Sequence, residues 1–201
     1  MPNKYNNFAE LCKCETEGKD FRRVICSRNS GVAIIAPHGG KIEKGTSEIA
    51  TAIAGNLHSS YLLEGIKTSN NCWLHVASEN FDDPECLDLV SECDTVIAVH
   101  GKNGDGLYTQ FGGLDNVANN VIKQSLEASG FNTDPDTDNA LSGRSDKNIC
   151  NRGRSLGGVQ LEIRHELRVH LIDNPDQFSR YSRAISTAIG GRLIISPATY
   201  T

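Results

Sequence analysis

The sequence predicts a three-layer α/β/α fold with a largely parallel β-sheet in the middle layer. Short apolar runs rich in β-branched residues alternate along the chain with longer stretches of helical periodicity. The run Val32–Ala36 is apolar at every position, as expected for a strand that helices cover on both faces. There is no internal repeat, low-complexity tract or linker, so residues 1–201 are predicted to form a single domain.

The expected elements follow from these patterns in chain order. Strands are predicted where β-branched and aromatic residues gather, at Phe21–Ser27, Val32–Ala36, Tyr61–Leu63, Trp73–Val76, Thr95–Val99 and Val159–Ile163. Helices are predicted where apolar residues recur at helical spacing, at Ser47–Leu57, Pro84–Glu92, Asn116–Ser129 and Pro175–Ile189. This alternation predicts a parallel sheet between helices, and ligands in such folds lie beyond the carboxyl ends of the strands.

Composition excludes several classes of partner. A net charge of −5 and a pI near 5.7 argue against nucleic acid, which usually needs a basic surface. The seven cysteines are odd in number and include no CxxC pair, which favours free thiols over a disulfide framework. The N-terminus has no apolar signal region, and no apolar run is long enough to cross a membrane. We therefore expect a protein made in the cytoplasm without a signal peptide, with no membrane partner.

Two predicted strands end in the same way. Val32–Ala36 runs into Pro37 and His38, Thr95–Val99 runs into His100, and glycine follows each histidine. Histidines at the carboxyl ends of neighbouring strands could converge on a metal ion, with Glu43 as a third ligand. Two imidazoles, a carboxylate and an open position form a common catalytic zinc site. The alternative is that both histidines only bond loop backbone where their strands end.

A carboxylate occurs inside another apolar strand. Glu162 lies within Val159–Ile163, where an unpaired charge would be costly to bury. A glutamate whose pKa is raised by burial suits a general base. The structural alternative is an ion pair with Arg164 or Arg168.

Basic residues gather near these positions in the sequence. Those around Glu162 are Arg144, Lys147, Arg152, Arg154 and Arg164, and those beside the histidines are Lys41, Lys44 and Lys102. Arginine binds carboxylates with two parallel hydrogen bonds, so the cluster suits a substrate that bears repeated carboxylates. Basic surface loops also occur without any binding role.

Three other motifs match only as strings. Gly153–Gly157 reads GxSxG, but a loop precedes Ser155 where a nucleophile elbow needs a strand. Gly40–Ser47 resembles a phosphate-binding loop, but Thr46 stands where the lysine should be. His165–His170 has one residue too many for HExxH, so its histidines would not share a helix face.

Four blocks together resemble the phage-type poly-γ-glutamate hydrolases, which are related to zinc carboxypeptidases. The blocks are Pro37–Glu48, Val99–Gly101, Asn148–Gly153 and Gly158–Ile163. The resemblance implies a carboxypeptidase-like fold with a mixed, mostly parallel sheet. It also implies zinc on His38, Glu43 and His100, with Glu162 as general base. Carboxypeptidases usually have HxxE rather than the spacing from His38 to Glu43, so Glu48 is a reserve ligand.

The resemblance also implies a function for the whole chain. We expect a zinc-dependent hydrolase of γ-glutamyl amide bonds, made by a phage and released by host lysis to degrade a poly-γ-glutamate capsule, and acting as a monomer. Arg152, Arg154 and Arg164 are the expected substrate-binding residues. Cobalt or manganese could replace zinc on such ligands. The alternatives are a zinc carboxypeptidase or N-acyl amino acid deacylase acting on small substrates, and a non-catalytic capsule-binding module.

Overall fold

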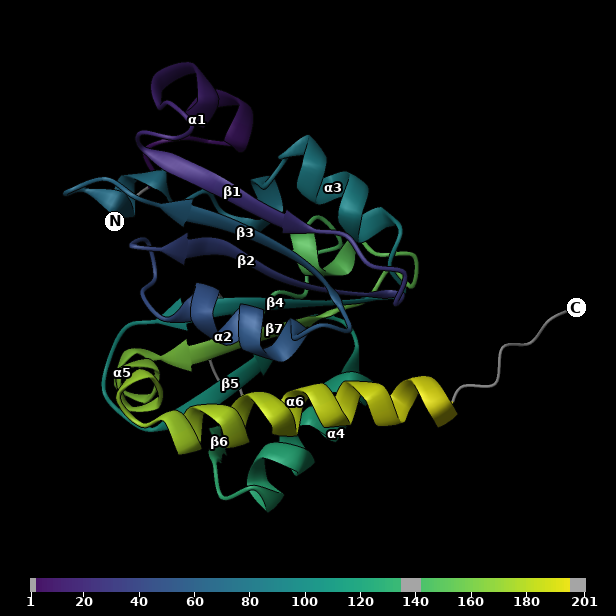
Figure 1. Ribbon diagram of the computed structural model, residues 1–201. Coiled ribbons are helices and arrows are strands. Elements are labelled where there is room, and N and C mark those ends of the chain that lie inside the picture. Colours follow the sequence, from purple (N-terminus) through teal and green to yellow (C-terminus); the bar gives the residue numbers. More distant parts are fainter. Residues whose placement is uncertain (1–2, 135–141, 196–201) are drawn as a thin grey trace, which may run out of the picture.

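A seven-stranded mixed sheet forms the middle of the molecule. The computed structural model describes residues 3–134 and 142–195, and Figure 1 shows its elements. The strand order is β1-β3-β2-β4-β7-β5-β6. The neighbours β3–β2, β2–β4, β4–β7 and β5–β6 are parallel, whereas β1–β3 and β5–β7 are antiparallel. The strands are β1 (Phe21–Cys26), β2 (Val32–Gly40), β3 (Ser59–Gly65), β4 (Thr95–Lys102), β5 (Tyr108–Gly112), β6 (Asn132–Asp134) and β7 (Val159–Arg164).

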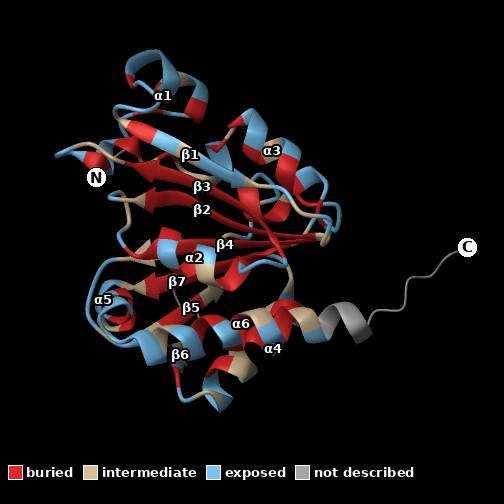
Figure 2. Ribbon diagram, viewed as in Figure 1, coloured by how far each residue is buried: buried red, intermediate tan, exposed pale blue. Residues whose placement is uncertain are grey.

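Helices cover both faces of the sheet, which confirms the predicted three layers. On one face α1 and α3 pack over β1–β4, and on the other α2, α4, α5 and α6 pack over β2, β4 and β7. Figure 2 shows that β2, β3, β4 and β7 are buried along most of their length. The helices are α1 (Phe8–Cys14), α2 (Thr46–Ala54), α3 (Pro84–Ser91), α4 (Asn116–Ala128), α5 (His165–Asp173) and α6 (Pro175–Ile195).

Local sequence explains several element boundaries. The Asp83 side chain caps α3 by accepting a hydrogen bond from the Glu85 N–H, and Pro84 occupies the first turn, where its missing N–H costs nothing. The helix α2 ends at Ala54, three residues earlier than predicted, and its C-cap residue Gly55 has a φ of 51°, which suits glycine. No helix within the described residues is long and apolar enough to cross a membrane.

The predicted strand Trp73–Val76 is wrong. A short 3₁₀ helix, Asn71–Leu74, occupies this segment instead. The Asn71 side chain accepts a hydrogen bond from the Lys67 N–H and donates one to the Lys67 carbonyl, while Asn70 has a φ of 59°. These side chain–backbone contacts curl the chain and compete with strand pairing. The sequence analysis also missed α1, α5 and the short strands β5 and β6.

Parallel pairing brings the predicted site to one edge of the sheet. The strands β2, β3, β4 and β7 point the same way, so their carboxyl ends meet at the left edge in Figure 1. In the β4–β7 register His100 lies opposite Glu162 and Lys102 lies opposite Arg164. Directly opposed residues project from the same face of a sheet.

Candidate active site

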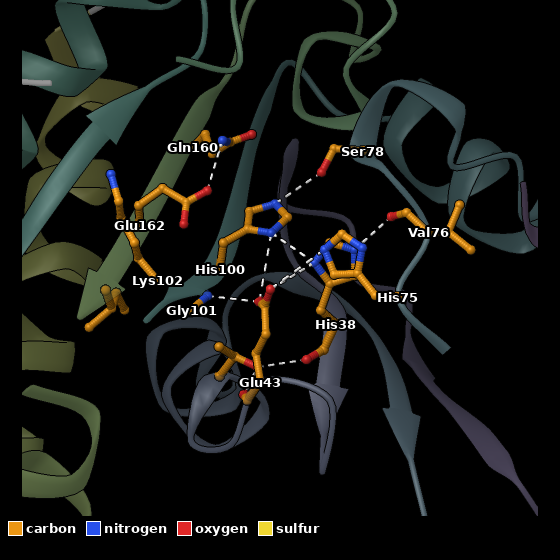
Figure 3. A network of polar contacts seen from close by, with 12 residues as sticks. His38, Glu43, His75, Val76, Ser78, His100, Gly101, Lys102, Gln160 and Glu162 are labelled. Atoms are coloured by element: carbon orange, nitrogen blue, oxygen red, sulfur yellow. Dashed lines mark hydrogen bonds and ion pairs between the residues drawn. The ribbon is translucent and has the colours of Figure 1, made fainter. Parts of the chain in front are cut away.

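Imidazoles from three segments converge on one carboxylate at this edge. Figure 3 shows Glu43 among His38 of β2, His100 of β4 and His75, which follows the short helix Asn71–Leu74. The distance from His38 Nδ1 is 3.1 Å to His100 Nδ1 and 3.3 Å to Glu43 Oε1. Glu43 Oε2 lies 3.9 Å from His100 Nδ1 and 2.7 Å from the Gly101 nitrogen, whose N–H donates to it.

An irregularity in β2 turns His38 toward this cluster. Residues Ala33 and Ile35 face the core beneath α1 and α3, and strict alternation would place His38 on the opposite face. The pairing of β2 with β3 shifts register between Ala36 and Gly39, around Pro37, which cannot donate to the ladder. His38 consequently bonds the Val76 carbonyl on the α1/α3 side, the side on which His100 lies.

Each histidine of the cluster has a polar partner for the ring nitrogen that faces away from Glu43, here called the outer nitrogen. The other ring nitrogen, the inner one, is directed at Glu43. His38 Nε2 donates to the Val76 carbonyl at 2.7 Å, and His75 Nδ1 donates to Asn3 Oδ1 at 2.8 Å. His100 Nε2 lies 3.4 Å from Ser78 Oγ. An outer hydrogen bond of this kind fixes the tautomer in which the other nitrogen presents a lone pair, as metal-binding histidines require.

The donor set fits a zinc ion. Tetrahedral coordination at bond lengths of about 2.0–2.1 Å places neighbouring ligand atoms about 3.3 Å apart. The distances from His38 Nδ1 to His100 Nδ1, 3.1 Å, and to Glu43 Oε1, 3.3 Å, are close to that value, whereas the other carboxylate oxygen, Oε2, lies 3.9 Å from His100 Nδ1. All three are mostly buried, with side-chain exposures of 2%, 16% and 4%.

His75 is a member of the cluster that the sequence analysis missed. Its ring stacks on His38 with centroids 3.8 Å apart, and its Nε2 lies 3.8 Å from Glu43 Oε1. One ligand atom each from His38, Glu43 and His75 lie within 4.8 Å of one another, which makes His75 a further metal-ligating candidate. Its side chain is 35% exposed, more than those of the other members. The prediction of a strand over Trp73–Val76 concealed it, because it treated His75 as a position within a strand.

The protonation equilibria of the cluster are strongly coupled. Burial opposes a charge on His38, but the Glu43 carboxylate and the Val76 carbonyl outweigh it and raise the His38 pKa. Burial and the His38 charge lower the pKa of His100 to about 3. The His38 charge and burial lower that of His75 to about 3. Burial alone would raise the Glu43 pKa, but His38 and the Gly101 N–H lower it to about 2. The cluster therefore accommodates one positive charge beside an ionised Glu43.

Glu162 differs from Glu43 in its surroundings. Burial and the nearby Glu43 charge raise the Glu162 pKa to about 8. The Gln160 amide donates to Glu162 Oε1 at 3.0 Å, and Gln160 in turn accepts from the buried Asn148 side chain at 2.9 Å. This chain of amides fixes the carboxyl group on the face of the sheet that carries His100 (Figure 3). Two carboxyl groups with widely separated pKa values are a common arrangement in acid–base catalysis.

A pocket of about 1010 Å³ lies next to the cluster and is rich in cationic side chains. Glu43, His75, Gly101 and Trp73 contribute to its wall, and its basic residues are Lys4, Lys41, Lys44 and Arg168. Cations around a cleft attract anionic substrates and raise their local concentration. The predicted neighbours Lys41 and Lys44 are thus part of this pocket.

The three predicted substrate-binding arginines lie in different places. Arg164 follows Glu162 by two positions on the same face of β7; it donates to the Asn103 carbonyl and packs over the Tyr108 ring. Arg152 donates to the carbonyls of Glu79, Phe81 and Lys147 and thus connects two loops. Arg154 pairs with Asp94 just before β4 begins, at the opposite end of the sheet from the histidines.

Two residues considered as alternatives lie outside the cluster. Glu48, the reserve ligand, is exposed on α2 and lines a separate, largely apolar pocket beside Phe178. Ser155 is exposed in a turn, where its hydroxyl donates to the Gly157 carbonyl. The surroundings of these two residues thus favour neither a ligand role nor a nucleophile role.

Comparisons with known proteins identify the family of this chain. Residues 5–188 match the poly-gamma-glutamate hydrolase family. The UPF0714 protein YmaC of Bacillus subtilis (strain 168) is 35% identical over 175 residues, which are 87% of this chain and 74% of YmaC. A bacteriophage poly-gamma-glutamate hydrolase structure superposes with a TM-score of 0.91 at 29% identity, over 97% of this chain and all of that one. Zinc-free apo YndL, also from Bacillus subtilis, gives 0.89 at 28% identity, over 95% and 99% of the two chains. The chain therefore belongs to the poly-gamma-glutamate hydrolase family.

Proposed function

We propose that this protein is a zinc-dependent hydrolase that cleaves the γ-glutamyl amide bonds of poly-γ-glutamate. The observation that carries the proposal is the convergence of His38, Glu43 and His100 beside Glu162 and next to a cationic pocket. The family and the similar phage enzyme support the substrate. The zinc-free form described for YndL supports the metal.

His38, Glu43 and His100 are the proposed zinc ligands. Their donor atoms have the spacing of a zinc site, and two imidazoles with one carboxylate are a ligand set typical of zinc hydrolases. His75 lines the pocket and is the most exposed of the four, so we assign it to substrate contact rather than to the metal. Zinc in such a site supplies a Lewis acid that acidifies water and polarises a carbonyl group.

Glu162 is the proposed general base and acid. In its ionised form it accepts a proton from the attacking water as the water oxygen bonds to the scissile carbonyl carbon. It then returns the proton to the amide nitrogen, so that the C–N bond breaks and leaves an amine and a carboxylic acid. Glu162 must be ionised for the first step, and the nearby positive charge of Lys102 favours that form. The Gln160 amide holds one carboxyl oxygen still and leaves the other to carry the proton.

The basic residues are proposed to bind the polymer. Poly-γ-glutamate carries one carboxylate per residue, and Lys4, Lys41 and Lys44 line the pocket. Arg164 lies beside Glu162 on the same sheet face and stays a candidate for substrate contact. The position of Arg154 at the opposite sheet end supports leaving it out of the site. We further propose that the enzyme is a phage product that acts on a bacterial capsule after lysis.

The test is a measurement of metal content and polymer cleavage on the same preparation. We expect one zinc per chain, shortening of poly-γ-glutamate, loss of cleavage with a chelator and recovery when zinc is added. An α-linked polyglutamate of similar length is the matched control and should remain uncut. Cleavage that is indifferent to chelation would refute the zinc site, and an intact γ-linked polymer with zinc bound would refute the substrate.

A further inference from the structure

A buried arginine beside the cluster has no individual role in the function proposed above. Arg168, in the second turn of α5, is 3% exposed and lines the pocket together with Glu43 and His75. The structure gives it no carboxylate partner within residues 3–134 and 142–195. Glu43 and Glu162 attract its charge from beyond ion-pair distance, but burying a cation at this depth is costly and calls for further partners.

Main-chain carbonyls hold most of the guanidinium. Nε donates to the Lys44 carbonyl at 2.7 Å, and Nη1 donates to the carbonyls of Ile163 and, at 3.4 Å, Lys102. These carbonyls belong to the loop that carries Glu43, to β7 and to β4. The guanidinium is thus fixed relative to three of the four segments that supply the proposed ligands and base, the fourth being β2 with His38.

The other terminal nitrogen, Nη2, has no hydrogen-bond partner among the described residues. It therefore retains two N–H donors on a side chain that lines the pocket. Lys41 and Lys44 in the same pocket are exposed and carry compact charges on flexible stems, whereas Arg168 offers donors of fixed direction.

Gly101 makes room for this arrangement. A Cβ at position 101 would lie 2.4 Å from Arg168 Nη1 and 2.5 Å from Cζ, so the guanidinium packs directly on the glycine. The N–H of the same glycine donates to Glu43 Oε2. Gly101 therefore contacts both the Arg168 guanidinium and the Glu43 carboxylate at the centre of the cluster.

The chemistry of a γ-linked polymer suggests what the free donors would bind. In poly-γ-glutamate each amide nitrogen is bonded to a carbon that also carries a free α-carboxylate. In an α-linked chain that carboxylate is itself an amide, except at the last residue. A fixed arginine next to the scissile bond can therefore distinguish the two linkages at every position along the polymer.

We propose that Arg168 is a specificity-determining residue that binds the α-carboxylate adjacent to the scissile γ-amide. This inference rests on the proposed function for the identity of the substrate. It assigns Arg168 a contact with substrate in addition to its backbone contacts, and it names the feature of the polymer that the pocket recognises.

Calorimetric binding measurements with two ligands test the assignment. The ligands are γ-linked triglutamate and its counterpart with every α-carboxylate converted to a carboxamide, and a chelator prevents turnover. The wild-type protein should prefer the carboxylate ligand. Arg168→Lys should reduce that preference by about tenfold to hundredfold, the value of a charged hydrogen bond, and leave binding of the carboxamide unchanged. Arg180→Lys, at an exposed arginine of α6, is the matched control and should keep the preference.

The same measurements can overturn the assignment. If Arg168 had a purely structural role, Arg168→Lys would weaken the binding of both ligands equally. The ratio of the two affinities would then stay at the wild-type value. A wild-type protein that does not prefer the carboxylate would also exclude the role. Gly101→Ala, which displaces the guanidinium but keeps Arg168, provides a second variant if Arg168→Lys folds poorly; an unchanged preference there also counts against the proposal.

Polymer cleavage by the zinc-loaded wild type separates this inference from the proposed function. A preference that depends on Arg168 in a protein without zinc-dependent cleavage would leave the carboxylate site standing and refute the hydrolase. If cleavage depends on zinc but the ligand preference does not depend on Arg168, the hydrolase function stands and the role of Arg168 is refuted.

Discussion

Replacing Glu162 with glutamine should inactivate the protein and also stabilise its metal-free form. Burial raises the pKa of Glu162 from 4.5 to about 8, so the folded state disfavours the ionised carboxylate. At about 1.36 kcal/mol per pKa unit, the full cost of ionisation is about 5 kcal/mol. This cost is absent below pH 4.5, grows as the pH rises toward 8 and is constant above it. Glutamine is close in shape to the protonated acid and does not ionise.

The difference between the variant and the wild type therefore depends on pH. Glu162→Gln should gain about 4 kcal/mol over the wild type on going from about pH 5 to about pH 9. Glu162 and His38 attract each other electrostatically, so the histidine titrations differ between the two proteins and do not cancel fully in this difference, which is on the order of 4 kcal/mol. The gain corresponds to a shift of about 1.5 M in the urea midpoint at an m-value of about 2–3 kcal/mol/M.

Urea unfolding of both proteins in the presence of chelator measures this shift. Glu92→Gln, at an exposed carboxylate, serves as a control and should show no such dependence on pH. In the zinc-loaded protein, Glu162→Gln should keep the metal and lose about 10²–10⁴-fold in kcat on poly-γ-glutamate. An equal midpoint difference at both pH values would refute the raised pKa. A kcat within tenfold of wild type would remove Glu162 from proton transfer.

Other substitutions test the ligand assignment and the charges of the pocket. His38→Ala and His100→Ala should lose zinc and activity together, whereas His75→Ala should retain zinc and lose activity. Elemental analysis of the purified variants measures the zinc. Zinc loss in His75→Ala together with zinc retention in His100→Ala would exchange the roles of these two histidines. Glu43→Gln should lose zinc while Glu48→Gln retains it, because only Glu43 faces the histidines; the opposite result would make Glu48 the ligand. Replacing both Lys41 and Lys44 with glutamine should raise KM severalfold at low ionic strength with little change in kcat, and the difference should shrink as added salt screens the exposed charges. A KM that stays at the wild-type value would place the polymer elsewhere.

Local sequence pattern predicted most of the central strands and longer helices correctly, with Trp73–Val76 as the exception. The apolar strands and longer helices, the three layers and the strand-end positions of His38 and His100 follow from periodicity and from glycine placement. Glu162 stood out because a carboxylate inside an apolar strand is costly in any fold. The resemblance of four sequence blocks to poly-γ-glutamate hydrolases is confirmed by the family match.

Other features could not be read from the sequence. The strands β5 and β6 are short, and the identity of β7's neighbours depends on long-range pairing that no local segment encodes. The Asn71 side chain bonds the Lys67 backbone and thereby competes with strand formation. His75 reaches the cluster because its segment, for which a strand was predicted, forms a short 3₁₀ helix instead. The irregular pairing around Pro37 decides the face on which His38 lies.

The sequence by itself determined which chemical groups end the central strands, because a strand and the residue after it are contiguous in the chain. Only the tertiary structure decided which groups meet there, because convergence depends on strand order and on loops that return from distant segments. Arg154 and Arg168 show the difference. Both are close to Glu162 in sequence, yet β7 separates them in space, with Arg154 at its amino end beside Asp94 and Arg168 beyond its carboxyl end beside Gly101. A strand of six residues spans about 20 Å, and that distance separates an arginine beside the site from one far from it.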